Sequence, residues 1–180
     1  HRNERMAGHI LTVEDPIEYY FTSKKSVVNQ REVGIDTVSL QTALRNGLRQ
    51  APDVFFIGEI RDRETMSAAL GYAQTGHLCV ATLHANNSHH ALNRILSFFP
   101  IEVRTSMMGD LATTLKAIIS QRLLRTKDGV RVPATEILLN TKLVADMIAK
   151  ADFAGVKEAV EKSMTEGSQT FEEDIARLIH

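Results

Sequence analysis

The side chains with the clearest chemical potential follow a strongly apolar segment. In the stretch LRQAPDVFFIGEIRD, residues 48–62, four apolar or aromatic residues run directly into a glycine, Glu59 and then Arg61. A carboxylate just past the last buried residue of a strand is where many phosphate-handling α/β enzymes hold a metal ion or a water molecule. An ordinary strand that ends in a polar turn has the same pattern, so Glu59 alone leaves both interpretations open.

Two further strand-like segments also end in polar clusters. Residues 10–13 lead into Glu14-Asp15-Pro16-Ile17-Glu18, and residues 78–81 lead into Thr82-Leu83-His84. The carboxyl ends of parallel strands meet at one edge of a sheet, and open α/β sheets bind their ligands there. Three polar strand ends at one edge therefore indicate a site.

The spacing of apolar residues predicts strands that alternate with helices, and hence an α/β fold with a parallel central sheet. The segments 54–58 and 78–81 are expected to be buried strands, because continuous apolar runs suit a sheet covered on both faces. Strands are also expected at 10–13 and from 27, a hairpin at 122–124 and 132–139, and helices at 40–50, from Asp62 to Gly76, from Asn87 or Ser88 to Pro100, and at about 102–119.

We expect a core domain over residues 1–140 and a small helical region over residues 141–180. The 180 residues, 43% hydrophobic and 24% charged, are typical of a soluble globular protein. A net charge of −1 gives no electrostatic footprint for nucleic acid. No apolar run approaches the roughly 20 residues of a membrane span, and residues 1–9 are too polar for a secretory signal. The single cysteine excludes an internal disulfide and fits a reducing cytoplasm.

Several of these segments resemble one family of secretion ATPases. LRQAPDVFFIGEIRD is similar to the family's signature around its Walker B acid, ILTVEDPIE to its "Asp box", and TGHLCVATLHANNS to its "His box". The likeness extends through VNQREV at 28–33 and ISQRLL at 119–124. On these motifs the chain is identified as a member of the type IV pilus retraction ATPases, the PilT/PilU family, and is most similar to the PilU branch.

The resemblance implies a RecA-like (P-loop NTPase type) core whose parallel sheet is flanked by helices. It implies an ATP-hydrolysing hexameric motor that drives pilus retraction and twitching motility. The implied partners are copies of this chain or a paralogous retraction ATPase in one ring, and a platform protein at the inner membrane. The implied location is cytoplasmic, at the base of the pilus, with no integral membrane segment and no nucleic acid.

The resemblance also implies roles for three carboxylates. Glu59 would polarise the water that attacks ATP, while Glu14 and Glu18 would help to hold Mg²⁺ through water and order the attacking water. Phosphoryl transfer depends on positioning and charge neutralisation, so carboxylates suit this chemistry. On the residues alone, Glu14 and Glu18 are also what a plain polar turn would contain.

In the same family, His77 and His84 would sense the γ-phosphate, and Arg31 and Arg61 would steady charge or pair with a neighbouring subunit. The plainer alternatives are a helix-end residue for His77 and a satisfied core histidine for His84. Because no acid or cysteine accompanies the histidines at 84, 89 and 90 at ligand spacing, we expect no structural metal there.

Two departures from the family pattern stand out. No G-x-x-x-x-G-K-[ST] motif occurs, since Lys25-Ser26 and Lys162-Ser163 lack the preceding glycines. In the family that loop lies upstream of the strand at Ile10, so we expect this chain to be the C-terminal part of a longer protein and to bind nucleotide weakly by itself. Second, Ala145-Asp146 replaces a family Arg-Asn pair.

The second departure leaves an alternative open: an accessory ring subunit that does not hydrolyse ATP and acts through a paralogous retraction ATPase. An ATPase for export or conjugation is disfavoured by VNQREV and by the absence of a cysteine-paired metal module. A nucleic-acid motor is disfavoured by the charge balance.

Overall fold

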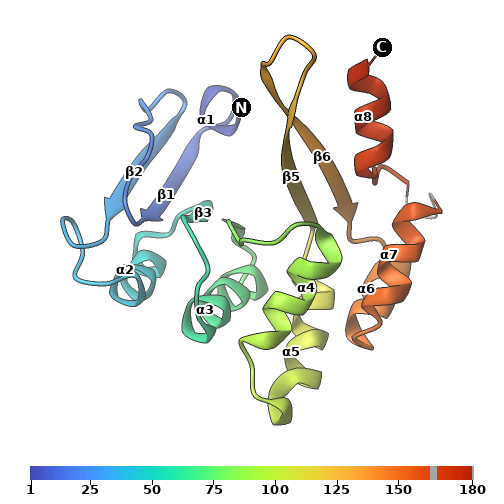
Figure 1. The fold of residues 1–180 in the computed structure, drawn as a ribbon. Coiled ribbons are helices and arrows are strands. Elements are labelled where there is room, and N and C mark those ends of the chain that lie inside the picture. Colours follow the sequence, from blue (N-terminus) through green and yellow to red (C-terminus); the bar gives the residue numbers. More distant parts are fainter. Residues whose placement is uncertain (163–165, 180) are drawn as a thin grey trace. The chain divides into compact units, whose positions relative to one another are not determined.

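The computed structural model describes residues 1–162 and 166–179 (Figure 1). The chain divides into two compact units, His1–Leu83 and His84–His180, and each is described by itself. The predicted α/β class is confirmed by the four-stranded parallel sheet and its helices. The division into a 1–140 core and a 141–180 helical region stays a prediction. Within the described ranges, no helix is both long and apolar enough to cross a bilayer.

The first unit is built on a sheet whose strand order is β2-β1-β3-β4, with each neighbouring pair parallel. The short helix α1 precedes the sheet, and α2, the 3-10 helix η1 and α3 connect its later strands. The bounds are α1 Arg2–Arg5, β1 Gly8–Glu14, β2 Ser26–Glu32, α2 Leu40–Gly47, η1 Leu48–Gln50, β3 Val54–Ile57, α3 Arg63–Gln74 and β4 Leu78–Ala81.

The helices α2 and α3 pack on one face of this sheet. The ring of Phe55 on β3 stacks on Tyr72 of α3 with ring centroids 4.6 Å apart, and the Tyr72 hydroxyl donates to the carbonyl of Leu44 on α2. Asp62 caps α3 as predicted, because its side chain accepts a hydrogen bond of 2.7 Å from the backbone N–H of Thr65. This packing fixes where β3 ends and α3 begins.

Residues 78–81 form the predicted strand, β4, but the prediction that this strand is buried is wrong. Leu78 is 50% exposed and Val80 is 43% exposed. They lie opposite Val54 and Phe56 in register, on the face away from Phe55 and therefore away from α2 and α3. A continuous apolar run also fits an edge strand such as β4, and the sequence pattern does not separate the two cases.

Cys79, on the helix-covered face, is half-buried, and this burial raises the pKa of its thiol to about 11.

Gly58 allows the end of β3 to approach β1 closely. The backbone N–H of Gly58 donates to the carbonyl of Val13 at 2.8 Å. A Cβ atom at position 58 would lie 3.1 Å from the Cα of Glu14 and 3.3 Å from that carbonyl oxygen. A side chain at this position would therefore push the two strand ends apart.

The second unit contains an antiparallel hairpin and five helices among its described residues. The predicted hairpin is confirmed, but its first strand begins at Ala117, because the backbone leaves the helical region at Leu115 (φ −57°, ψ 138°). The predicted helix to residue 119 is therefore too long. The bounds are α4 Ser88–Ser97, α5 Ile101–Thr114, β5 Ala117–Arg125, β6 Arg131–Leu139, α6 Lys142–Ala149, α7 Phe153–Glu161 and α8 Phe171–Ile179.

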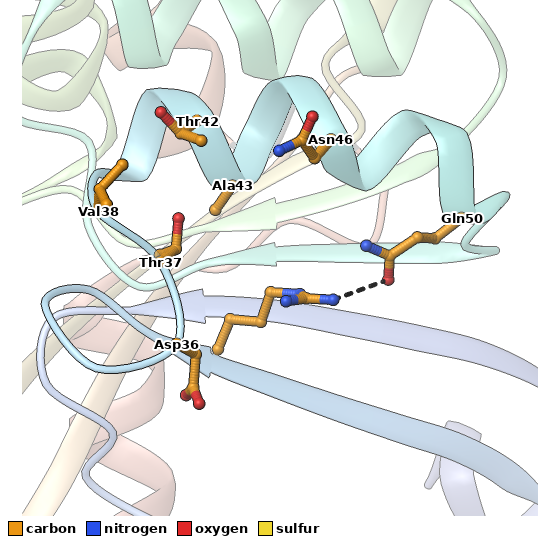
Figure 2. A pocket seen from close by; sticks show the side chains of 8 residues that line it. Asp36, Thr37, Val38, Thr42, Ala43, Asn46 and Gln50 are labelled. Atoms are coloured by element: carbon orange, nitrogen blue, oxygen red, sulfur yellow. Dashed lines mark hydrogen bonds between the residues drawn. The ribbon is translucent and has the colours of Figure 1, made fainter.

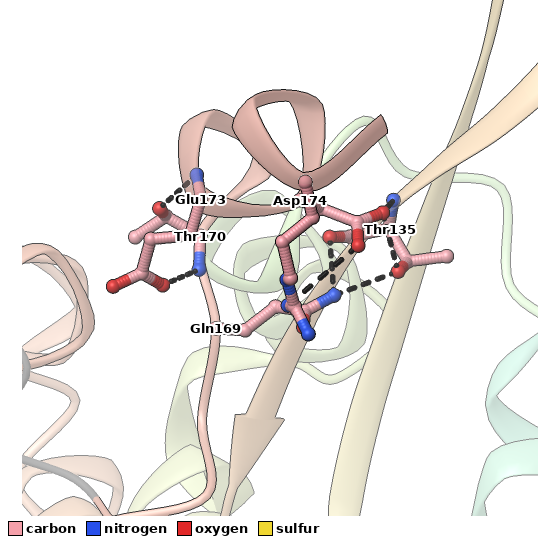
Figure 3. Close-up of polar contacts among 6 residues, drawn as sticks. Thr135, Gln169, Thr170, Glu173 and Asp174 are labelled. Carbon is pink, nitrogen blue, oxygen red and sulfur yellow. Dashed lines mark hydrogen bonds and ion pairs between the residues drawn. The ribbon is translucent and has the colours of Figure 1, made fainter. Parts of the chain in front are cut away.

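Helix α8 is attached to β6 by a small polar network (Figure 3). The Asp174 carboxylate accepts hydrogen bonds from the backbone N–H and the hydroxyl of Thr135, at 2.8 and 3.0 Å. The Gln169 side chain donates to the carbonyl and hydroxyl of the same threonine. Thr170 and Glu173 cap the start of α8 reciprocally. The backbone hydrogen bond from Thr135 is the main cause that lowers the pKa of Asp174.

We expect Gly58→Ala to lower the free energy of unfolding by about 1–3 kcal/mol, because the new methyl group would lie 3.1 Å from the backbone of β1, closer than an ordinary contact. Gly71→Ala, near the end of α3, is the matched control, since its added Cβ would meet no atom within 4 Å beyond its own stretch of helix. That change should raise the same quantity by about 0.5–1 kcal/mol through helix propensity. Urea unfolding followed by circular dichroism measures both, and equal stability of the Gly58→Ala variant and the parent would contradict the close approach.

We expect Asp174→Asn to reduce the acid dependence of stability. A carboxyl whose folded pKa lies below its unfolded value stabilises the fold above the unfolded pKa of about 4, and this contribution is lost as the pH falls through the folded pKa. The variant should be less stable than the parent at neutral pH, and the difference should shrink at more acidic pH. Urea midpoints across pH measure this, with Glu172→Gln on the exposed side of α8 as the charge-matched control.

Candidate functional site

The carboxyl edge of the sheet brings together acidic residues from the ends of β1 and β3. Arg61 joins two of them, because its Nε donates to Glu59 Oε2 at 2.6 Å and its Nη1 lies 3.4 Å from Asp15 Oδ2. The hydrogen bond to Glu59 and the opposite charges raise the pKa of Arg61. The Glu59 side chain is 24% exposed, so this carboxylate is partly shielded but reachable from solvent.

Backbone hydrogen bonds join the ends of three strands at this edge. Gly58 donates to Val13 of β1, and Thr82, which follows β4, donates to the carbonyl of Ile57 at 3.3 Å. Ile60 returns a hydrogen bond of 2.9 Å to the Thr82 carbonyl, and the Thr82 hydroxyl donates to the carbonyl of Gly58. The backbone on both sides of Glu59 is thereby held in place.

Glu14 is the buried acid of this edge, with 8% of its surface exposed. Its Oε1 accepts hydrogen bonds from the Thr12 hydroxyl at 2.6 Å and from Gln30 Nε2 at 3.1 Å. Both bonds use Oε1, and Oε2 accepts no hydrogen bond from the residues that the structure describes. Glu18, predicted beside Glu14 as a site residue, lies in the exposed segment between β1 and β2 and forms no hydrogen bond or ion pair with the described residues.

His77 lies at the other edge of the sheet. It precedes β4, whereas Glu59 follows β3, and the two strands are parallel. Its Nδ1 lies 3.0 Å from the Thr75 hydroxyl, and its ring meets Tyr72 edge-on at 6.3 Å. The structure therefore does not bring His77 to Glu59, and its contacts are those of a helix-end histidine. Its predicted role at the γ-phosphate stays a prediction.

Arg31 lines a separate pocket between β2 and α2 (Figure 2). Its NH2 lies 3.4 Å from Gln50 Oε1, and its buried Nε has no hydrogen-bond partner among the described residues. The register opposite Val13 places Arg31 on the helix-covered face of the sheet, whereas Glu14 faces the other side. The cavity, of about 410 Å³, is lined by Arg31, Asp36, Thr37, Val38, Thr42, Ala43, Asn46 and Gln50.

The remaining predicted histidine, His84, is exposed and opens the second unit. In that unit the rings of His89 and His90 lie 4.3 Å apart. Among residues 1–162 and 166–179, no three histidine, cysteine or acidic side chains are grouped as a metal site would require.

Sequence reasoning missed two contributors to the first unit's cluster. The sequence places Asp15 in a polar strand end, but only the structure shows it as the second partner of Arg61. Gln30 was quoted only within a family motif, yet it donates to Glu14. The alternation along β2 puts Gln30 on one face, but only the pairing register shows that this is the face of Glu14.

The arrangement can bind water and position it. Glu14 and Glu59 offer carboxylate oxygens at one edge, and Arg61 supplies a nearby positive charge. Mg²⁺ in phosphate-transfer sites is held by one or two carboxylates together with substrate phosphates. The donor set at this edge fits that requirement.

Comparison with known proteins identifies relatives among the secretion and pilus ATPases. Residues 2–171 match the family described as "Type II/IV secretion system protein". The type IV pilus ATPase PilU of Pseudomonas aeruginosa is 49% identical over 179 residues, which cover 99% of this chain and 47% of PilU. The type IV pilus retractation ATPase PilT of the same organism is 39% identical over 177 residues, 98% of this chain and 52% of PilT.

Among solved structures, the crystal structure of the pilus retraction motor PilT with bound ADP matches with a TM-score of 0.89 and 42% identity. The match covers 98% of this chain and 50% of that one. The chain thus spans about half the length of the relatives it matches. Since the family match runs through nearly all of the chain and the fold agrees, this chain belongs to the PilT/PilU family of type IV pilus ATPases, among the Type II/IV secretion system proteins.

Proposed function

We propose that this chain is the catalytic part of an ATP-hydrolysing, hexameric motor for type IV pilus retraction and twitching motility. The observation that carries the proposal is the cluster of Glu14, Asp15 and Glu59 at one sheet edge, with Arg61 bonded to two of the three. The relatives named PilU and PilT, the latter solved with ADP, support nucleotide as the substrate. Carboxylates at such an edge suit a reaction that depends on positioning and charge neutralisation.

In this mechanism Glu59 polarises the water that attacks the terminal phosphate. The hydrogen bond from Arg61 Nε orients the Glu59 carboxylate and balances its charge. Glu14, held through Oε1 by Thr12 and Gln30, presents Oε2 to order a water molecule. Fixing acids before the substrate arrives reduces the reorganisation that the reaction needs.

Glu14 and Glu18 are the residues that would hold Mg²⁺, through water. The ion supplies neutralisation of the phosphate charges when it is bound. The glycine-rich phosphate loop with its lysine is not among these 180 residues, so nucleotide binding by this chain alone is proposed to be weak. His77 and His84 as γ-phosphate sensors, and Arg31 as a charge-steadying residue, remain proposals that rest on the family.

The proposed assembly is a ring of six copies, or a ring shared with a paralogous retraction ATPase. It would act in the cytoplasm against the platform protein at the inner-membrane base of the pilus. The names of the pilus ATPases PilU and PilT support this setting.

A second candidate function is a non-hydrolysing accessory subunit that acts through a paralogous ATPase. The supporting observation is on α6, where Asp146 is exposed and Ala145 half-buried, while Val144 and Ile148 form the buried side. The departure from the family's Arg-Asn pair therefore changes what α6 presents outward and leaves its packing side intact. Such a change can alter the output of a motor without altering hydrolysis.

We expect a version of the protein extended to the length of its relatives to hydrolyse Mg-ATP, and this chain alone to hydrolyse it poorly. Glu59→Gln in the extended protein should lower kcat by about 100-fold or more, since the amide cannot accept the proton of the attacking water. Glu64→Gln, an exposed charge-matched change in the first turn of α3, should leave kcat within about two-fold. Release of phosphate measures all four, and an inert extended protein would favour the accessory subunit instead.

A further inference from the structure

The segment between β1 and β2 exposes three consecutive aromatic side chains. Tyr19, Tyr20 and Phe21 are 70, 76 and 51% exposed, and the rings of Tyr19 and Phe21 meet edge-on at 5.3 Å. Despite this exposure, hydrogen bonds hold the backbone of the segment at both ends. Its aromatic side chains are therefore presented on an ordered backbone.

Two side-chain amides provide this support, one on each side. Asn3 donates from Nδ2 to the carbonyl of Thr22, and its Oδ1 accepts from the backbone N–H of Lys24, both at 2.8 Å. Gln30 accepts from the backbone N–H of Phe21 at 2.7 Å through Oε1 and donates from Nε2 to the carbonyl of Tyr19 at 2.9 Å. Only the second amide also reaches the site.

The third hydrogen bond of Gln30 runs from Nε2 to Glu14 Oε1 at 3.1 Å. The orientation of the amide follows from its partners, because the Phe21 N–H requires an acceptor, and the Tyr19 carbonyl and the Glu14 carboxylate both require a donor. One planar group is therefore shared between the aromatic segment and the buried acid. A flip of the amide would lose all three hydrogen bonds.

Glu14 depends on few other groups for its orientation. Thr12 supplies its only other hydrogen bond among the described residues. Two other acids are its neighbours in the strand pairing. Glu32 lies opposite Glu14 in register and accepts a hydrogen bond from the N–H of Ile17. Asp15 follows Glu14 and is contacted by Arg61. Within residues 1–162 and 166–179 no positive group is bonded to Glu14, so the neutral donor Gln30 carries much of its positioning.

We propose that Gln30 is a positioning residue that fixes the Glu14 carboxylate and ties it to the segment Tyr19–Phe21. Because one amide holds both groups, movement of this segment changes the orientation of Glu14. The inference rests on the proposed function, since Glu14 is taken there as the residue that orders water.

The plain alternative is that Gln30 only anchors the segment, as Asn3 does. The two residues give a matched pair of variants in the extended protein. Gln30→Met and Asn3→Leu each remove one anchor and keep a similar side-chain size, so both should speed hydrogen exchange of the backbone amides of residues 19–25. Only Gln30→Met should lower kcat, by about 10-fold, with the KM for ATP changed less than about two-fold.

A third variant, Gln30→Glu, tests the contact with Glu14 directly. Its carboxylate can still accept from the Phe21 N–H but faces Glu14 with a like charge, so at neutral pH kcat should fall by on the order of 100-fold. Two facing carboxyl groups can share a proton as the pH falls. The deficit in kcat relative to the parent, and the excess exchange of residues 19–25, should therefore shrink toward acidic pH for Gln30→Glu and not for Gln30→Met.

The measurements are phosphate release and hydrogen exchange by mass spectrometry on the same extended proteins across pH. Equal kcat for the parent and Gln30→Met, alongside faster exchange, would overturn the positioning role. Equal pH dependence of Gln30→Glu and Gln30→Met in exchange would overturn the contact with Glu14. If the parent hydrolyses no ATP, the proposed function fails, and the exchange comparison alone decides whether Gln30 links Glu14 to the aromatic segment.

Discussion

The site in the first unit depends on one backbone contact, the hydrogen bond from Gly58 to Val13 at the carboxyl end of β3. The absence of a side chain at position 58 allows this close approach, since a Cβ there would lie only 3.1 Å from the Cα of Glu14. The contact brings the residue after Gly58, the acid Glu59, to the strand end that carries Glu14. Two residues of the strand before Gly58, Phe55 and Ile57, are fully buried on the face that α2 and α3 cover, which fixes the position of β3. Packing on one side of the sheet thus sets the geometry of the polar edge.

Bringing acids together has an electrostatic cost, and the cluster offsets it in two ways. Arg61 lies between Glu59 and Asp15 and interacts with both. Glu14 is buried away from that cation and is stabilised instead by the neutral donors Thr12 and Gln30. Exposed ion pairs contribute little to folding stability, so the value of the Arg61 contacts lies in orientation. This edge has three acids, Glu14, Asp15 and Glu59, and one cation, Arg61. Such an excess of negative charge suits a site that binds a metal cation together with its substrate.

The sequence predicted the elements, and which strand ends carry polar residues, better than the contacts among those residues. A glycine and an acid after an apolar run were enough to place Glu59 at a strand end. The link from Gln30 to Glu14 depends on the register of β1 against β2, which no local pattern encodes. The position of His77 could have been predicted from the sequence. His77 precedes β4 and Glu59 follows β3, and in a pair of parallel strands these two positions lie at opposite edges of the sheet. The exposure of β4 could not have been predicted, since an apolar run looks the same in the sequence of a central strand and of an edge strand.

The chemistry and the altered helix lie in different compact units of the chain. Glu14, Glu59 and Arg61 belong to the first, and α6 with Asp146 to the second. Each unit has its own buried residues, and Val144 and Ile148 of α6 belong to those of the second. Exposed residues on a packed helix can change with little effect on stability, whereas the Gly58 contact and the shared amide of Gln30 cannot change without moving an acid. The exposed side of α6 can therefore diverge in sequence while the side that packs in its own unit is kept.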